Sequence, residues 1–217
     1  MGKSARCKKK KYCIEGFART MKNFAITGMG RSGTTFLSQL MNRSEVWTVL
    51  HEPGIQRKAP IEKVQPRFQK DFYGEVNSYL MNVFKDLEVE KKAILIRHPH
   101  DVFLSAYNRR PKFKCETVVP FMKEHYTILD SYLEEGIKMI RFEKMTTDIV
   151  YLQSLLDDFE INDVEICQED LDIKINTNKE YHCDNFEDID TKCKESFLKE
   201  VNWFADKYYD VFSNTAK

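Results

Sequence analysis

The stretch FAITGMGRSGTTFLSQLM, residues 24–41, constrains the fold of this chain more than any other. It runs from a short apolar segment through a glycine-rich loop, Gly28 to Gly33, into residues with helical apolar spacing. This order predicts a strand that ends at Thr27 and a helix that begins near Thr34. Backbone amides at a helix N-terminus lack intrahelical partners and lie at the positive end of the helix dipole. We therefore expect this loop to bind an anion such as a phosphate group.

Short apolar segments alternate with helical patterns along the chain. The expected strands are residues 23–27, 46–50, 93–97 and 137–142, and they are rich in β-forming residues. Helical spacing is found at Val76, Leu80, Val83 or Phe84, and Leu87, again over residues 121–132, and in the segment 197–212. The alternation predicts an α/β fold with a parallel β-sheet flanked by helices. Because no linker-like stretch interrupts it, we expect a single domain, 22–217, after a basic and flexible tail, 1–21.

Charge and cysteine usage exclude several classes of protein. Lys plus Arg and Asp plus Glu both number 34, so no net charge favours binding to nucleic acid. No window approaches the roughly 18 consecutive apolar residues of a membrane span, and no stable membrane insertion is expected. The six cysteines form no C-x-x-C pair and suggest neither a metal site nor a disulfide framework. We expect free thiols in a reducing compartment and a cytoplasmic location.

Three kinds of nucleotide-binding loop fit the glycines. Gly28, Gly30 and Gly33 spell G-x-G-x-x-G, and Glu52 follows an expected strand where a dinucleotide-binding oxidoreductase places its ribose-binding acid. A P-loop kinase or NTPase is the second possibility, but Thr34 stands where its lysine should be. The third is a loop for a dense terminal anion. It is favoured by the guanidinium of Arg31 and the hydroxyls that follow it in GRSGTT.

A second phosphate-binding element is expected in AILIRHPHDVFLSAY, residues 93–107. Arg97 ends a strand and Ser105 lies two turns into the following helix, so the two can converge on one phosphate. Pro99 can start that helix without losing a needed amide donor. The structural alternative is that Arg97 only forms a salt bridge with Asp101.

These segments together resemble the sulfotransferase family. GRSGTT resembles the 5′-phosphosulfate loop in the R-S-G-T-T form of the carbohydrate and tyrosine branches, and residues 93–107 resemble the 3′-phosphate segment. KMIRFEKM, residues 138–145, is similar to the R-Y-E-D-L strand end of the family. The resemblance covers about residues 24–148 and implies a P-loop NTPase-like sulfotransferase fold. The C-terminal third shows no counterpart of the adenine-side segment of the cytosolic branch.

The resemblance implies a donor, a reaction and a set of site residues. The donor is 3′-phosphoadenosine 5′-phosphosulfate (PAPS), the product is PAP, and no metal is implied. The implied donor-binding residues are Gly30, Arg31, Ser32, Gly33, Thr34, Thr35, Arg97 and Ser105. Arg31 is also expected to stabilise the leaving phosphate, and Glu52 to act as the base, with His51 as the alternative.

The acceptor is the least constrained part of the prediction. We expect a hydroxyl on a small molecule or glycan, with a carbohydrate favoured, and a wall at residues 54–74 that includes Arg57, Lys58, Lys63 and Arg67. The oligomeric state stays open. A nucleotide kinase, an NTPase or a dinucleotide-binding oxidoreductase remain the alternatives.

Overall fold

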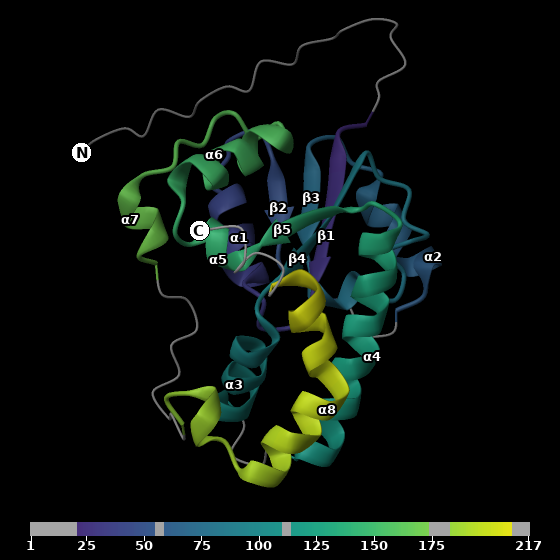
Figure 1. Ribbon diagram of the computed structural model, residues 1–217. Helices are drawn as coiled ribbons and strands as arrows, with labels where there is room; N and C mark the ends of the chain where they lie inside the picture. Colours follow the sequence, from purple (N-terminus) through teal and green to yellow (C-terminus); the bar gives the residue numbers. More distant parts are fainter. Residues whose placement is uncertain (1–20, 55–58, 110–113, 174–182, 210–217) are drawn as a thin grey trace, which may run out of the picture.

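The computed structural model describes residues 21–54, 59–109, 114–173 and 183–209 (Figure 1). These residues form a five-stranded parallel sheet with the strand order β2-β3-β1-β4-β5. The strands are β1 (Asn23–Gly28), β2 (Thr48–Leu50), β3 (Tyr73–Val76), β4 (Lys91–Ile96) and β5 (Lys138–Arg141). The predicted α/β fold class is confirmed, and each of the four expected strands overlaps an observed one.

Helices cover both faces of the sheet (Figure 1). They are α1 (Thr34–Met41), α2 (Ile61–Val64), α3 (Pro99–Arg109), α4 (Cys115–Glu134), α5 (Phe142–Met145), α6 (Ile149–Asp158), α7 (Gln168–Leu171) and α8 (Thr191–Tyr208). The described residues also contain three 3-10 turns: η1 (Gln65–Phe68), η2 (Ser78–Leu80) and η3 (Phe186–Asp188). No helix in the described part of the chain is long and apolar enough to cross a membrane.

Two buried apolar clusters hold the layers together. Phe24 and Ile26 of β1 pack with α1 and α6 on one face, whereas Ala25 between them faces α3, α4 and α8 on the other. This alternation is the period-two pattern of a strand buried on both sides. Because β1 is central and fully buried, the loop that follows it is held between two packed helical layers.

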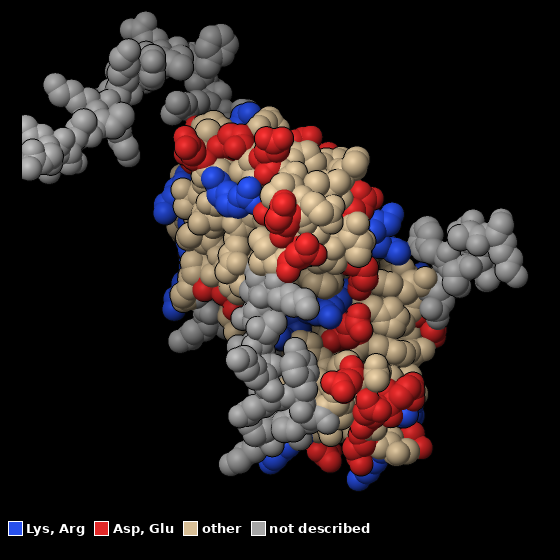
Figure 2. Space-filling model, turned by 90° about the vertical axis from the view of Figure 1, so that its left-hand side faces the viewer, with Lys and Arg blue, Asp and Glu red and all other residues tan. Residues whose placement is uncertain are grey.

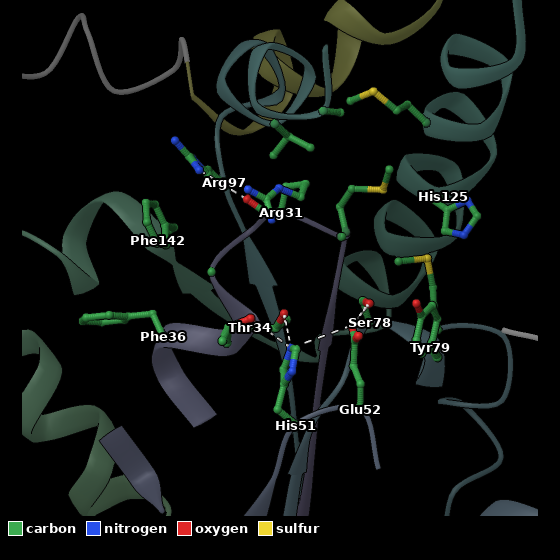
Figure 3. A pocket seen from close by; sticks show the side chains of 18 of the residues that line it. Arg31, Thr34, Phe36, His51, Glu52, Ser78, Tyr79, Arg97, His125 and Phe142 are labelled. Carbon is green, nitrogen blue, oxygen red and sulfur yellow. Dashed lines mark hydrogen bonds and ion pairs between the residues drawn. The ribbon is translucent and has the colours of Figure 1, made fainter. Parts of the chain in front are cut away.

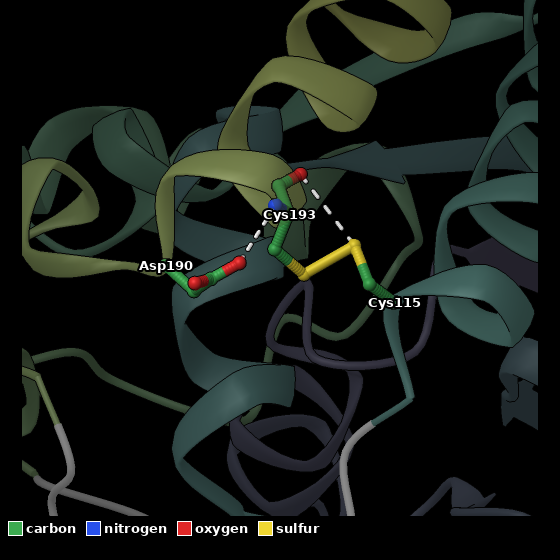
Figure 4. The surroundings of a disulfide bond; sticks show 3 residues. All are labelled: Cys115, Asp190 and Cys193. Carbon is green, nitrogen blue, oxygen red and sulfur yellow. Dashed lines mark hydrogen bonds between the residues drawn. A yellow bond between two sulfur atoms is a disulfide. The ribbon is translucent and has the colours of Figure 1, made fainter.

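Helices α4 and α8 lie side by side and run in the same direction (Figure 1). Their contacts keep a nearly constant offset in sequence: Tyr126 packs on Phe204, and the Lys123 ammonium pairs with the Glu200 carboxylate at 2.5 Å. The same offset joins Cys115 to Cys193 in a disulfide with a Cα–Cα distance of 5.6 Å (Figure 4). The prediction of free thiols is therefore wrong for this pair. Helix packing brings together two cysteines that are 78 positions apart.

The helix predicted from Val76 to Leu87 is also wrong. Val76 ends β3, a strand inserted between β1 and β2, and Leu80 ends the short turn η2. The apolar residues of this stretch are buried as the pattern indicated, but a strand and turns bury them. A glycine at position 74 hid the strand, because glycine is unusual in strands. It is required here since a Cβ would lie 2.1 Å from the Phe24 ring.

On the face that Figure 2 shows, side chains of both charges are interspersed. Figure 2 shows acidic side chains spread over one face, with a group of basic atoms recessed near its centre. The basic tail expected at residues 1–21 falls almost wholly outside the described residues, as do Arg57 and Lys58 of the expected wall. The single-domain boundary at residue 22 stays a prediction.

Candidate active site

A cavity of about 960 Å³ lies at the carboxyl edge of the sheet (Figure 3). Residues that directly follow each strand line it: Gly30 and Arg31 after β1, Glu52 after β2, Ser78 after β3, Arg97 after β4 and Phe142 after β5. Open parallel sheets bind their ligands at this edge, and the volume is within the range of small-molecule sites. The structure therefore brings the glycine-rich loop, Glu52 and Arg97 of the sequence prediction into one cavity.

The loop after β1 has a backbone that only certain residues permit. Gly33 has a φ of 98° and is the N-cap of α1, and a Cβ there would lie 2.3 Å from the Phe142 ring. Arg31 also has a left-handed φ, 77°, a strain that is often found at functional sites. No side chain caps α1, so the amides of its first turn are open to an anion.

Ser32 does not face the cavity. Its side chain is fully buried, and its hydroxyl donates to the Met29 carbonyl at 2.6 Å. The Ser32 amide bonds to the same carbonyl at 3.1 Å. This geometry gives Ser32 the role of closing the loop, while the neighbouring Thr34 and Thr35 line the cavity.

One end of the cavity is cationic. Arg31 Nε donates to Ser105 Oγ at 3.0 Å, and Arg97 Nη1 donates to the Arg31 carbonyl at 3.3 Å. The Arg97 guanidinium also stacks over the Phe142 ring at 4.7 Å, and its buried Nε has no hydrogen-bond partner in the structure. The structure thus joins Arg31 to Arg97 (Figure 3) and to Ser105, two contacts that sequence spacing did not indicate.

The alternative salt bridge of Arg97 to Asp101 is present but loose. Arg97 Nε lies 3.9 Å from Asp101 Oδ2, beyond hydrogen-bond distance. The Asp101 side chain is half exposed, where such a pair contributes little. Arg97 is therefore not fully used by Asp101, and its unpartnered buried Nε is a reason to expect an anionic ligand here.

At the other end of the cavity, His51 lies against the start of α1. Its Nε2 is 3.2 Å from both Thr34 Oγ1 and Thr35 Oγ1 (Figure 3). Burial lowers the pKa of His51, and the nearby Glu52 carboxylate opposes this only in part. The imidazole is therefore neutral near pH 7. His51 is therefore part of the cavity wall.

Glu52 lies beside His51, with the His51 Nε2 atom 3.8 Å from Glu52 Oε1. The Ser78 hydroxyl donates to the same carboxylate oxygen at 2.5 Å.

The strand order separates Glu52 from the strand that carries the glycine loop, because β3 lies between β2 and β1. A dinucleotide-binding fold instead places its second strand next to the first and takes the ribose-binding acid from that segment. The topology thus argues against the oxidoreductase alternative.

Sequence reasoning missed the second, mostly apolar wall of the cavity. It comes from the loop after β1, from η2 and the residue after it, and from α3 and α4, and includes Met29, Tyr79, Met81, Val102, Val118, Phe121, Met122 and His125. These residues look like ordinary core positions in the sequence, and no local signal separates them from the core. None of the described residues of the wall predicted at 54–74 lines this cavity, and Arg67 is turned inward to pair with Glu75.

His98 and His100, next to Arg97, pack away from the cavity. His100 Nε2 lies 2.8 Å from Asn202 Oδ1 on α8, and the His100 ring stacks on Phe186 at 4.1 Å. The His98 ring contacts that of Tyr209 at 4.9 Å. These contacts tie the start of α3 to α8 and thereby fix the position of Arg97.

A parallel sheet with a glycine-rich loop after its central strand and arginines at its carboxyl edge is the general arrangement of α/β proteins that bind nucleotides or phosphate groups. Neither a protein-family model nor a curated protein sequence matches this chain. Solved structures do match it. One is mouse sulfotransferase SULT7A1 complexed with PAP, with a TM-score of 0.54 and 14% identity over 87% of this chain and 86% of that one. A sulfotransferase from Alicyclobacillus acidocaldarius has a TM-score of 0.45 and 14% identity over 87% of this chain and 96% of that one. The chain has the sulfotransferase fold.

Proposed function

We propose that this protein is a sulfotransferase that moves a sulfuryl group from PAPS to an acceptor hydroxyl. One observation carries the proposal: the uncapped start of α1, the Arg31–Arg97–Ser105 group and Glu52 line or border a single cavity. A donor with phosphate at both its 3′ and 5′ positions matches two separate anion sites. The amides and hydroxyls of Thr34 and Thr35 would hold the 5′ end, and Arg97 with Ser105 the 3′-phosphate.

The proposed chemistry needs three contributions from the chain. As the acceptor oxygen forms its bond to sulfur, the bond from sulfur to the phosphate oxygen breaks, and that oxygen keeps the electron pair. The helix N-terminus and Arg31 would stabilise the charge that develops there. Glu52 would take the acceptor proton. Since Arg31 Nε bonds to Ser105 in the structure, Arg31 must turn toward Thr34 to act at the leaving phosphate.

The wall opposite the loop bears on the acceptor. Among the described lining residues, the lysine and arginine side chains are Arg31 and Arg97 alone, and both are assigned to the donor. The rest of this wall is largely aliphatic, aromatic and methionine side chains, which suit an apolar body better than a ring of hydroxyls. The sequence resemblance favours a carbohydrate, whereas the lining favours an apolar alcohol or phenol. Transfer of labelled sulfate to matched glycans, phenols and tyrosyl peptides separates these acceptors.

Donor specificity is the direct test of the proposal. We expect PAP to bind about 10- to 150-fold more tightly than AMP, because a charge-assisted contact to the 3′-phosphate contributes roughly 1.5 to 3 kcal/mol. Calorimetry with PAP, AMP and ATP gives the three affinities. Arg97→Gln should weaken PAP binding and leave AMP binding nearly unchanged. Equal affinity for PAP and AMP, or tighter binding of ATP, would favour the kinase alternative.

Arg31 provides a second test. Arg31→Lys should lower kcat by about tenfold, because one ammonium cannot replace the planar fork of donors that a guanidinium presents to phosphosulfate oxygens. Donor KM should change less, since the leaving oxygen carries more charge in the transition state. Ser105→Ala is the matched control: it removes the partner of Arg31 and should raise the donor KM more than it lowers kcat. A fully active Arg31→Lys enzyme would show that positive charge alone suffices.

A further inference from the structure

Behind the cavity, on β3, lies a carboxylate that the proposed chemistry does not use. The side chain of Glu75 is fully buried, and this burial raises the pKa of its carboxyl group. Tyr73 donates to Glu75 Oε1 at 2.6 Å, Asn77 Nδ2 donates to Oε2 at 3.2 Å, and Arg67 pairs with Oε2. A buried ion pair is weak evidence for stability, because desolvation offsets its attraction. The role of the Arg67–Glu75 pair therefore lies in the other contacts that these two side chains make.

The first contact leads to the residue after Glu52. Arg67 Nη1 donates to the Pro53 carbonyl at 3.3 Å while Nη2 pairs with Glu75. The turn at this point is tight: Glu52 has a φ of 45°, and the Gly54 amide donates to the Glu52 carbonyl at 2.8 Å. A non-glycine residue in this conformation persists only where its surroundings hold it. Arg67 supplies such a hold.

The second contact leads to the Glu52 side chain itself. Asn77 donates to Glu75 through Nδ2, and its Oδ1 accepts from the Tyr79 amide at 2.9 Å, which caps η2. The residue between them, Ser78, donates its hydroxyl to Glu52 Oε1 at 2.5 Å. Two chains of contacts therefore connect Glu75 Oε2 to the region of Glu52. One passes through Arg67 to the Pro53 carbonyl, and the other passes through Asn77 to the neighbouring Ser78, whose hydroxyl contacts Glu52.

We propose that Arg67 and Glu75 are positioning residues for Glu52: together they fix the turn after β2 and the Ser78 hydroxyl, and so aim the Glu52 carboxylate into the cavity. This inference rests on the proposed function, because aiming matters only if Glu52 acts on an acceptor. A buried hydrogen-bonded network of this kind rigidifies the groups that it pairs, although the buried Nε of Arg67 itself has no hydrogen-bond partner in the structure. A small displacement of a catalytic group lowers the rate without lowering donor affinity.

The test compares Arg67→Lys with Tyr73→Phe. Lysine keeps the charge beside Glu75 but cannot bond to both Glu75 and Pro53 as a guanidinium does. Tyr73→Phe removes a hydrogen bond to the same buried carboxylate but keeps the contacts of Arg67 with Pro53 and of Ser78 with Glu52, so it is the matched control. Arg67→Lys should lower kcat by roughly 10- to 100-fold with PAP affinity unchanged within about twofold. Tyr73→Phe should lose thermal stability yet keep kcat within about twofold.

Ser78→Ala gives a second, milder variant that breaks only the last contact of the network. It should lower kcat by about three- to tenfold with the melting temperature nearly unchanged. If the kcat losses of all three variants follow their losses of stability, Arg67 and Glu75 are merely structural and the proposal is overturned. If Arg67→Lys does not fold, an unchanged kcat of Ser78→Ala also overturns it.

Crystal structures of the variants give a readout that does not depend on activity. In Arg67→Lys the turn at Glu52 should shift and the Ser78–Glu52 bond should lengthen, whereas both should persist in Tyr73→Phe. An unmoved turn in Arg67→Lys would refute the positioning role. A wild-type protein that transfers no sulfuryl group from PAPS would instead refute the proposed function, and the structures would still decide whether the network holds Glu52.

Discussion

Glu52→Gln should lower sulfuryl transfer by about 10²- to 10⁴-fold, the usual contribution of a general base. Glutamine keeps the shape of the side chain and can still accept the Ser78 hydroxyl bond, so the turn after β2 should persist. It cannot take a proton from the acceptor. PAP affinity and melting temperature should be unchanged, and single-turnover transfer from PAPS measures the chemical step.

His51→Ala separates the two candidate bases. Its imidazole contacts Thr34 and Thr35 at the start of α1, so its removal should change donor affinity more than the rate of transfer. If His51→Ala loses more activity than Glu52→Gln at saturating donor, His51 is the base. A fully active Glu52→Gln enzyme would end the role proposed for Glu52.

Loss of the Cys115–Cys193 disulfide should reduce the free energy of unfolding by about 2 to 4 kcal/mol. For a sequence separation of 78, the chain-entropy relation gives about 4.5 kcal/mol as an upper figure. The bond joins the first turns of α4 and α8, and α4 carries Val118, Phe121 and Met122 of the cavity wall. Loss of the disulfide should therefore raise the acceptor KM more than it changes the donor affinity.

Chemical denaturation of Cys115→Ser, with and without reductant, measures this effect. Cys167→Ser is the matched control, because Cys167 is an exposed free thiol and its loss should leave stability and reductant sensitivity unchanged. The wild type should lose stability in reductant, and Cys115→Ser should not respond to it. Equal stability of the two in oxidising buffer would show that the bond does not form in solution. Its formation would fit an oxidising environment better than the reducing one that cysteine spacing suggested.

The local sequence determined the loop, the helix after it, and the placement of Arg97 at a strand end with Ser105 on the following helix. Strand, glycines and helix are adjacent in the chain at residues 23–41, and the separation of eight positions from Arg97 to Ser105 covers one strand end and about two helical turns. Such elements follow from hydrophobic period and from the backbone conformations that glycine allows. For the same reason the sequence could place Glu52 at the edge of the sheet that carries the loop.

Only the tertiary structure decided what meets across the sheet. The insertion of β3 between β1 and β2 depends on backbone pairing with both neighbours. The four residues of β3, YGEV, contain no local pattern that predicts this pairing. The disulfide and the contact of Arg31 with Ser105 each join residues that are distant in the sequence. The contacts of Glu75 depend on the position of β3 in the strand order. Local periodicity reports which side chains are buried, but not which partners they meet, because packing between layers selects the partners.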